Sequence, residues 1–539
     1  MADLVKKLTL GIASGLMRKS ITSPSKWSCK YRVMGKPHPG PWSFTWHPWL
    51  KPMLDSDALD NVGMKSAQMG FTEAMLNFTF FQIDINGESV LYLMPTADSA
   101  SDFSTSRFDP ALEASPHLNN LFNSVKNVGL KRAGTASLYV RGTRSKTKLK
   151  EIPARIIIFD ELDEMVQANL PLAYERASGQ EDPIKWKIST PTINDFGISN
   201  EFESSTKEHY FFKCPHCSRH IELTIDELHV GDATPETSWY FCPSCKTIIE
   251  REEKRQALFD TGKFVKSCDS AQGIRGFHIN QMYSYTIKPE QLALSCIKAK
   301  NSLVEEQELN NSKLGLSFVM KGGQVTQKEI DDCKSEFLNG EEATSTFVTV
   351  GIDVGSMLHC AVYQWEFDQN GLDPVLSAHP RLLKAIDLPN FIDAEKLIES
   401  YRPKCFVIDC NPERRMAKEL CDKYFGLGYM CNFSNNAKNI DIKPSIDTDR
   451  LMNIDRSSWL DVVMRRFHKQ DIILPGDISS DYEKHVKSLV KILERDANNN
   501  VVAKYLTRGN DDHYAFSSLY NEVAMAIGTG SQVVKDIPA

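Results

Sequence analysis

The sequence predicts an α/β protein built from two successive α/β domains. Strand-like and helix-like segments alternate from about residue 60 to about residue 200, which indicates a mostly parallel sheet covered by helices. A second α/β pattern begins at Phe347. In each domain an apolar strand-like run ends in carboxylates, at residues 155–161 and again at 348–353. The expected domains therefore carry separate acidic sites at strand ends.

The composition favours neither a membrane-spanning nor a disulfide-stapled protein. The chain has 539 residues, ample for several cores, and a net charge of −7, so any nucleic-acid contact must be local. No apolar run approaches the ~18 residues needed to cross a bilayer. Leu8–Met17 is expected to form an amphipathic helix rather than a signal peptide, because Arg18 and Lys19 follow it directly. The thirteen cysteines are odd in number and favour buried thiols in a reducing cytoplasm.

The run Arg155-Ile156-Ile157-Ile158-Phe159-Asp160-Glu161 predicts a buried strand that delivers two carboxylates at its tip. An Asp there can hold Mg²⁺, and the adjacent Glu can activate the water that attacks a γ-phosphate. This is the Walker B pattern. The alternative interpretation is an ordinary strand followed by a helix cap.

A candidate phosphate-binding loop lies upstream, between the strand-like residues 62–64 and a helix-like run beginning at Glu73. Compared with G-x-x-x-x-G-K-[ST], it keeps the second glycine and the hydroxyl, but Phe71 occupies the usual lysine position. Lys65 can supply the cation from the other end of the loop. The candidate nucleotide-binding residues of this loop are Lys65, Ser66, Ala67, Gln68, Met69, Gly70, Phe71 and Thr72.

Two C-P-x-C knuckles, Cys214/Cys217 and Cys242/Cys245, are separated by twenty-four residues. Four thiolates satisfy tetrahedral Zn²⁺, and each two-residue turn places its pair of sulfurs on one ion. We expect a structural zinc ribbon within residues 205–255, with no open catalytic position. His216 and His220 are expected to be bystanders.

The second α/β region supplies a different acidic set. Asp353 and Asp409 each end an apolar strand-like run, and the pair Asp511-Asp512 precedes a helix-like segment beginning at His513. Carboxylates from two strand ends and a helix start are typical of ribonuclease-H-like nucleases, which use two metal ions to cleave phosphodiesters. The helix phase favours Asp512 over Asp511 as the third Mg²⁺ or Mn²⁺ ligand. Both remain candidates.

The displaced lysine resembles that of the large terminase subunits of lambda-type tailed phages. The similarity extends from about Trp27 to about Met525. It is carried by segments that flank the candidate loop and strand: Gly40-Pro41-Trp42, His47-Pro48-Trp49, Leu93-Met94-Pro95-Thr96, Ser189-Thr190-Pro191-Thr192 and Gly276-Phe277-His278-Ile279-Asn280. The fourth of these, residues 189–192, resembles the family's coupling motif.

The resemblance implies an ATP-driven motor that moves viral double-stranded DNA into procapsids, fused to an endonuclease that cuts concatemeric DNA. Its cofactors would be ATP, Mg²⁺ or Mn²⁺, and Zn²⁺. Its partners would be DNA, a small terminase subunit, the portal and further copies in a ring, with no membrane contact. It would act in the host cytoplasm and would not remain in the mature virion.

The expected organisation follows the same resemblance. It comprises an N-terminal segment for small-subunit contact (1–40), a P-loop ATPase of the RecA/ASCE-like class (41–322) including the ribbon, a linker (323–346), a ribonuclease-H-like domain (347–530) and a C-terminal tail for portal contact (531–539).

Several assignments stay open at this stage. The arginine finger can be Arg107, Arg141 or Arg144, and the basic stretch from Arg141 through Lys150 suits either DNA phosphates or a solvated face. Trp49 can stack on adenine or belong to the core. Two other functions compete with a packaging motor: a helicase or repair ATPase fused to a nuclease, and an inactive DNA-tethering protein. A helicase should carry a second RecA-like lobe, where this chain has the cysteine knuckles and the second acidic region.

Overall fold

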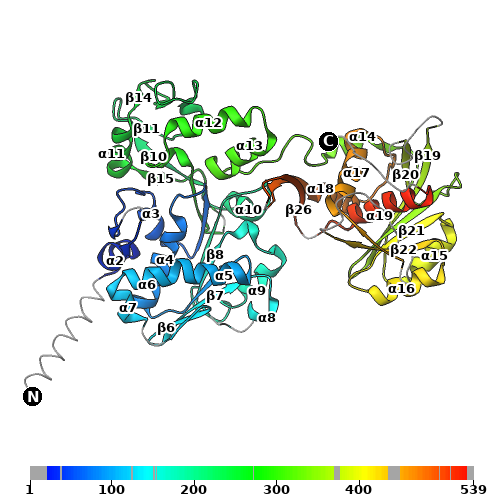
Figure 1. Ribbon diagram of the computed structural model, residues 1–539, viewed down its shortest axis with the longest axis horizontal. Helices are drawn as coiled ribbons and strands as arrows, with labels where there is room; N and C mark the ends of the chain where they lie inside the picture. The colour runs from blue at the N-terminus through cyan, green and yellow to red at the C-terminus, as the bar shows by residue number, and fades with distance from the viewer. Residues whose placement is uncertain are drawn as a thin grey trace, which may run out of the picture. The chain divides into compact units, whose positions relative to one another are not determined.

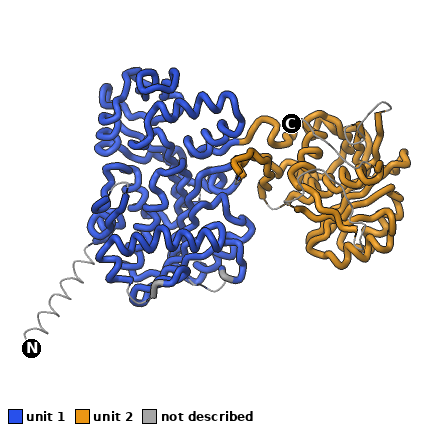
Figure 2. Tube along the Cα trace, viewed as in Figure 1, with its two compact units in different colours: residues 1–318 blue, residues 319–539 orange. Residues whose placement is uncertain are grey.

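The computed structural model describes residues 21–530, apart from 37–38, 123–124, 150–151, 153, 271, 369–376, 435–449, 497 and 510. The chain divides into two compact units, Met1–Phe318 and Val319–Ala539 (Figure 2). Residues 1–20 of the expected small-subunit segment and the whole expected portal tail, 531–539, lie outside the described residues.

The first unit is organised by an eleven-stranded sheet (Figure 1). Its path is β11-β10-β16-β3-β9-β8-β4-β7-β6-β5, with β15 paired to β10. All pairings from β10 through β7 along this path are parallel. The strands are β3 (Asp60–Lys65), β4 (Val90–Met94), β5 (Val125–Asn127), β6 (Leu130–Ala133), β7 (Ala136–Gly142), β8 (Ile156–Asp160), β9 (Ile184–Ser189), β10 (Glu208–Lys213), β11 (His220–Ile221), β15 (Lys263–Val265) and β16 (Arg275–Ile279).

Strand β8 shows why the sheet centre is parallel and buried. Every one of its five residues is buried. Successive side chains alternate between two cores: Ile156 and Ile158 join the larger one, whereas Ile157 and Phe159 join the smaller one on the opposite face. A strand that is buried on both faces has a continuous apolar sequence. The strand predicted from residues 155–161 is β8.

Helices and short helical turns cover both faces of this sheet. They are α2 (Pro24–Tyr31), α3 (Leu50–Leu54), α4 (Phe71–Phe81), α5 (Ala97–Phe103), α6 (Asp109–Ala114), α7 (Pro116–Leu121), α8 (Lys146–Leu149), α9 (Leu170–Tyr174), α10 (Gly197–Glu203), the π-turns η1 (Gln82–Asn86) and η2 (Ser104–Phe108), and the 3₁₀ turns η3 (Leu162–Glu164) and η4 (Gln167–Asn169). The short pair β1 (Val33–Met34) and β2 (Gly40–Pro41) precedes them.

The cysteine module is continuous with the main sheet. Strand β10 ends directly before the first knuckle, and β11, which follows the knuckle, pairs with β10. A three-stranded sheet, β12-β13-β14, follows. Its elements are β12 (Leu228–His229), β13 (Trp239–Phe241), β14 (Ile248–Ile249), η5 (Ile225–Glu227) and α11 (Arg251–Thr261). The unit ends with η6 (Gln281–Tyr283), α12 (Pro289–Ala299), α13 (Leu303–Glu308) and the π-turn η7 (Leu309–Leu314).

The second unit has a six-stranded sheet of order β20-β19-β18-β21-β22-β23. The first three strands are antiparallel, and the strands from β18 onward are parallel. The strands are β18 (Val348–Val354), β19 (Leu358–Phe367), β20 (Ala378–Leu388), β21 (Cys405–Asp409), β22 (Gly428–Phe433) and β23 (Leu451–Ile454). The helices are α15 (Phe391–Tyr401), α16 (Arg414–Lys423), α17 (Arg456–His468), α18 (Ser480–Ser488) and α19 (His513–Gly528). A hairpin of β25 (Leu489–Arg495) and β26 (Val501–Thr507) connects α18 to α19. The two α/β units confirm the predicted fold class.

The segment 323–346, which we expected to link the domains, instead contributes to the second unit. It contains α14 (Gln327–Asp332) and β17 (Lys334–Ser335), and β17 pairs with β24 (Leu474–Pro475). Its Gly, Glu, Asp and Thr content suggested a linker, but Val325, Ile330 and Cys333 enter the core. Burial of these three side chains attaches the polar segment to the second unit.

Helix α19 packs directly against β18 in the second unit (Figure 1). Gly351 permits this approach, since a Cβ at that position would lie 1.9 Å from the backbone oxygen of Ser517. Asn521 then ties the helix to the sheet by donating to the Ala361 carbonyl and accepting from Thr349 Oγ1, at 2.9 and 2.7 Å. The start of α19 is thereby held beside the tip of β18.

Within the described part of the chain, no helix combines the length and apolar character that a membrane span requires.

We predict that Gly351→Ala destabilises the second unit by about 2 kcal/mol or more, because the clash is with backbone and overpacking of this kind costs ~1–3 kcal/mol. Thermal unfolding of the full chain measures it. Gly355→Ala is the matched control, as its Cβ would meet only ordinary contacts at 3.6 Å. Equal unfolding temperatures for the two variants would show that α19 does not depend on this close approach.

Candidate active sites

The candidate phosphate loop joins the end of β3 to the start of α4. Lys65 is the last residue of β3, and Gly70 adopts a left-handed conformation with φ of 81° immediately before Phe71 opens the helix. A Cβ at Gly70 would also lie 2.9 Å from Leu50 Cδ1. The Ser66 hydroxyl is buried and has no hydrogen-bond partner among the described atoms. A helix N-terminus behind a tight loop is the backbone geometry that receives phosphate.

Phe71, which stands at the usual lysine position, is a core residue. Its side chain is 1% exposed, and its ring packs so closely on β3 that a Cβ at Gly63 would lie 2.7 Å from Phe71 Cε1. The cation must therefore come from elsewhere in the loop.

Lys65 points to the tips of the neighbouring strands. Its Nζ lies 3.2 Å from Glu161 Oε1, just after β8, and 3.4 Å from Thr190 Oγ1, just after β9. The sheet order β3-β9-β8 brings these three strand ends together. The displaced lysine and the Walker B glutamate thus meet across the head of the loop.

Asp160 is buried beside two hydroxyl groups. Tyr92 OH donates to Oδ2 at 2.6 Å, and Thr72 Oγ1 lies 3.4 Å from Oδ1. Burial, together with the charge of Glu161, raises the pKa of Asp160 to about 6, although Lys65 opposes both effects. A hydroxyl and a carboxylate at this spacing can hold Mg²⁺ either directly or through water.

Asp163, which sequence analysis did not single out, links the Walker B turn to the coupling segment. It accepts hydrogen bonds from the backbone N–H and hydroxyl of Thr192, both at 2.8 Å, and from the N–H of Ile198 at 2.7 Å. Burial raises its pKa to about 7 despite these donors. Asp163 therefore joins the turn after β8 to Thr192 and Ile198. Only the fold reveals this, because the partners lie about thirty residues away.

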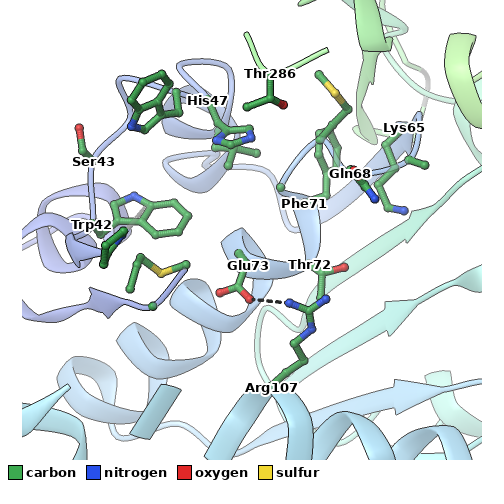
Figure 3. A pocket seen from close by; sticks show the side chains of 18 of the residues that line it. Trp42, Ser43, His47, Lys65, Gln68, Phe71, Thr72, Glu73, Arg107 and Thr286 are labelled. Carbon is green, nitrogen blue, oxygen red and sulfur yellow. Dashed lines mark ion pairs between the residues drawn. The ribbon is translucent and has the colours of Figure 1, made fainter. Parts of the chain in front are cut away.

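A cavity of about 730 Å³ opens over the loop (Figure 3). The loop forms one wall together with Glu161 and Thr190. The opposite wall comes from the N-terminal segment, including Trp42, Trp46 and His47. The indole nitrogen of Trp42 is buried without a hydrogen-bond partner among the described atoms. The size of the cavity and its mixture of polar and apolar lining residues suit a nucleotide.

Trp49 does not stand where an adenine could stack. It is fully buried, and its Nε1 donates to the Met69 carbonyl at 2.9 Å, so it supports the loop from beneath. Trp42 and Trp46 line the cavity instead. The local sequence placed several aromatics near the loop, but which ring faces the cavity depends on how the segment folds back.

Among the three candidate arginine fingers, Arg107 lines the cavity. It extends from η2 toward Glu73 in the first turn of α4, with Nη1 3.5 Å from Oε1, and is 57% exposed (Figure 3). Arg141 donates to the carbonyls of Gly129 and Val140, and Arg144 is exposed in the turn after β7. In the basic stretch, Lys150 and the side chain of Lys148 lie outside the described residues.

The four cysteines converge on one point. Cys214 Sγ lies 3.9 Å from Cys245 Sγ, and Cys217 Sγ lies 3.9 Å from Cys242 Sγ. The two knuckles match: Ser218 and Lys246, each following the second cysteine, both have positive φ. Sulfur atoms bound to one tetrahedral zinc at ~2.3 Å would be about as far apart as these are. The residues therefore fit a tetrahedral metal ion with all positions filled by thiolates.

In the second unit the tips of β18 and β21 bring Asp353 and Asp409 side by side. Ile352 pairs with Ile408 in the parallel register, so the two aspartates follow at neighbouring positions. Burial raises the pKa of Asp409 to about 6, and the charge of Asp353 contributes. Burial also raises the pKa of Asp353, whereas a hydrogen bond from His513 lowers it.

Asp511 and Asp512 lie in different surroundings. Asp512 precedes α19, accepts from Thr507 Oγ1 at 2.7 Å and adds to the negative charge around Asp353. Asp511 is exposed, lies 4.0 Å from His513 Nε2 and lines a cavity of about 460 Å³ together with His359 and His513. This geometry favours Asp512 as the companion of Asp353.

Two histidines beside Asp353 were missed in the sequence. His513 Nδ1 lies 2.8 Å from Asp353 Oδ2, and the rings of His359 and His513 stack at 4.2 Å. Ligand atoms of Asp353, His359 and His513 lie within 4.8 Å of one another. Across the described residues, Asp409 and Asp512 do not join that compact group. His513 follows the acidic pair directly, whereas His359 becomes visible only through its pairing with Asp353 across β18 and β19.

The chain resembles known proteins in sequence and in fold. Residues 36–264 match the family described as "Phage terminase large subunit gpA, ATPase domain". The large terminase subunit of Enterobacteria phage P21 is 23% identical over 278 residues, covering 46% of this chain and 43% of that protein. The large terminase subunit of Escherichia phage lambda is 21% identical over 340 residues, covering 56% of this chain and 53% of that protein. The chain is related to the large terminase subunits of lambda-type phages.

These similarities confirm the predicted relationship, and residues 36–264 are the part that matches the ATPase-domain model. The chain spans about half the length of the curated relatives that it matches. The crystal structure of the HK97 bacteriophage large terminase shares the fold, with a TM-score of 0.50, 10% identity and coverage of 93% of this chain and 98% of that one.

The buried hydrogen bond from Tyr92 to Asp160 should influence how ATP hydrolysis depends on pH. Tyr92→Phe removes a donor to the Asp160 carboxylate, which must raise the pKa of Asp160 above about 6. Because the carboxylate is the form that binds Mg²⁺, the acidic limb of the ATPase pH profile should move to higher pH by roughly one unit, given that a hydrogen bond to a charged group contributes ~1.5–3 kcal/mol.

The profile should be measured at limiting Mg²⁺. Tyr139→Phe, in β7 of the same sheet, is the control and should leave the limb in place. An unmoved limb in Tyr92→Phe would show that Asp160 does not govern it.

Proposed function

We propose that the first unit hydrolyses MgATP in the cavity above the β3–α4 loop. The observation that carries this proposal is the convergence of Lys65, Glu161 and Thr190 at three neighbouring strand tips. A lysine only 7% exposed beside a carboxylate supplies the positive charge that the phosphate loop otherwise lacks. The backbone of Ser66–Gly70 and the start of α4 complete the cradle.

Each residue then has a defined task. Lys65 contacts the β/γ-phosphate oxygens, while Thr72 and Asp160 bind Mg²⁺. Glu161, which is 39% exposed in its left-handed turn, orients the attacking water and accepts its proton. Arg107 exchanges its 3.5 Å contact with Glu73 for the developing negative charge on the γ-phosphate.

The second unit is proposed to be a metal-dependent endonuclease. Asp353, Asp409 and Asp512 would hold Mg²⁺ or Mn²⁺, whose charge activates water and stabilises the leaving 3′-oxygen. His513, hydrogen-bonded to Asp353, holds that carboxylate in place. Burial and, to a smaller extent, the charge of Asp353 raise the pKa of Asp409, and a bound cation would offset both effects.

The two activities together support a large terminase subunit. It would translocate double-stranded DNA into a procapsid and cut concatemeric DNA, working with a small terminase subunit and a portal protein in a ring within the host cytoplasm. The four cysteines would bind a structural Zn²⁺ that closes the ribbon. The coupling segment tied to Asp163 would relay hydrolysis to DNA movement.

We predict that Lys65→Ala reduces ATP hydrolysis by about 10²-fold or more, because it removes the charge that stabilises the transferred phosphoryl group. Metal-dependent nicking of plasmid DNA should persist. Lys185→Ala is the matched control: this lysine lies on β9 and pairs with Asp60 at 3.8 Å, away from the cavity. ATP turnover that survives in Lys65→Ala would overturn the assignment.

Glu161→Gln separates binding from hydrolysis. It preserves the shape and hydrogen-bonding capacity of the side chain but removes the base, so turnover should fall by ~10²- to 10⁴-fold. Nucleotide affinity, measured by calorimetry, should change little. A variant that neither binds nor hydrolyses ATP would assign Glu161 to structure rather than to the chemical step.

Asp353→Asn tests the second centre. The substitution keeps the volume but removes a charged metal ligand, so DNA cleavage should fall by about 10²-fold or more while ATPase activity is retained. Asp422→Asn, an exposed residue of α16 paired with Lys418, is the control. Unchanged Mg²⁺- or Mn²⁺-dependent cleavage by a folded Asp353→Asn protein would make the second unit a docking module.

A further inference from the structure

Two histidines and a glutamate outside both proposed centres converge at the edge of the main sheet. His209 on β10 and His278 on β16 are direct partners in the parallel pairing of these strands. Glu222, which follows β11, places its Oε1 2.7 Å from His209 Nδ1. The ligand atoms of the three side chains lie within 4.8 Å of one another.

The hydrogen bonds of His278 set its tautomer. Its Nε2 lies 3.2 Å from the Leu314 carbonyl oxygen and 3.1 Å from the Gly315 carbonyl oxygen. Carbonyl oxygens only accept, so Nε2 must carry the proton, and the lone pair remains on Nδ1. Metal-binding histidines are typically oriented in this way, with the second ring nitrogen donating to a backbone carbonyl.

Burial keeps this histidine neutral. His278 is 5% exposed, and desolvation, assisted by the nearby His209, lowers its pKa to about 4. Neutral imidazole is the form that binds a metal ion. The side chains of His209 and Glu222 are 29% and 24% exposed, which leaves a route for an ion and for water.

We propose that His209, Glu222 and His278 form a second metal site, distinct from the four-cysteine site and specific for a first-row transition-metal dication such as Zn²⁺. Two imidazoles and one carboxylate, with water in the remaining position, make up a recurrent zinc donor set. The alternative is a plain His209–Glu222 ion pair beside a neutral core histidine. The two differ in whether a metal ion replaces the proton shared by that pair.

The site would brace the floor of the nucleotide cavity. His278 pairs with Met64 in β3, one residue before Lys65. The Leu314–Gly315 carbonyls that hold its ring belong to a segment packed on the loop: a Cβ at Gly315 would lie 2.7 Å from Ser66 N, and Ala67 N donates to the Ser312 carbonyl at 2.8 Å. A metal that fixes His278 would therefore also fix the backbone beneath the phosphates.

Metal stoichiometry of the full-length chain tests the proposal. The protein would be stripped with a chelator, reconstituted with Co²⁺ or Zn²⁺, desalted and analysed for bound metal. Glu222→Gln and His209→Gln should each bind one equivalent per chain fewer than the unsubstituted protein. His220→Gln is the matched control, because this exposed residue of β11 lies two positions from Glu222 and outside the cluster.

The cobalt spectrum identifies which site is lost. The two variants should retain thiolate-to-cobalt charge-transfer absorption from the cysteines, while losing the weaker ligand-field bands of a nitrogen and oxygen site. Circular dichroism verifies that each variant is folded. Equal metal content and identical cobalt spectra in the unsubstituted protein and in both folded variants would overturn the proposal, leaving only the ion pair.

Discussion

The contact between the Lys65 ammonium and the Glu161 carboxylate is the interaction on which the first unit depends. It exists because β3, β9 and β8 are neighbouring parallel strands whose carboxyl ends meet at one edge of the sheet. Taking the lysine from the start of the loop frees the usual lysine position for Phe71, whose ring packs into the core against Gly63. The start of the loop thus supplies the positive charge, and its end supplies a side chain to the core.

Buried carboxylates connect that contact to the rest of the unit. Asp160 accepts hydrogen bonds from Tyr92 on β4 and Thr72 in α4, while Asp163 accepts them from Thr192 and Ile198. Their raised pKa values show that burial outweighs the hydrogen bonds that both receive. A cation at Asp160 would offset part of this cost.

The second unit also carries acidic side chains at the tips of neighbouring strands, and helix α19 contributes the remaining ones. Asp353 and Asp409 end adjacent parallel strands, and α19 brings Asp512 and His513 to the same edge because Gly351 lets the helix lie against the sheet. The histidines that surround Asp353 extend the set of groups able to contact a cation.

The sequence by itself determined the α/β class, strand β8 with its acidic tip, the displaced lysine and the paired cysteine knuckles. These features depend on residues that are consecutive or separated by a short turn, so periodicity and spacing reveal them. The tertiary structure alone decided that Trp49 is buried while Trp42 faces the cavity, that residues 323–346 belong to the second unit, and that Arg107 is the finger candidate lining the site. It also placed His359 beside Asp353, and His278 beside His209. These neighbours are created by strand order and register, which no local pattern encodes, because the free energy that selects them comes from burying whole sheets and helices against each other.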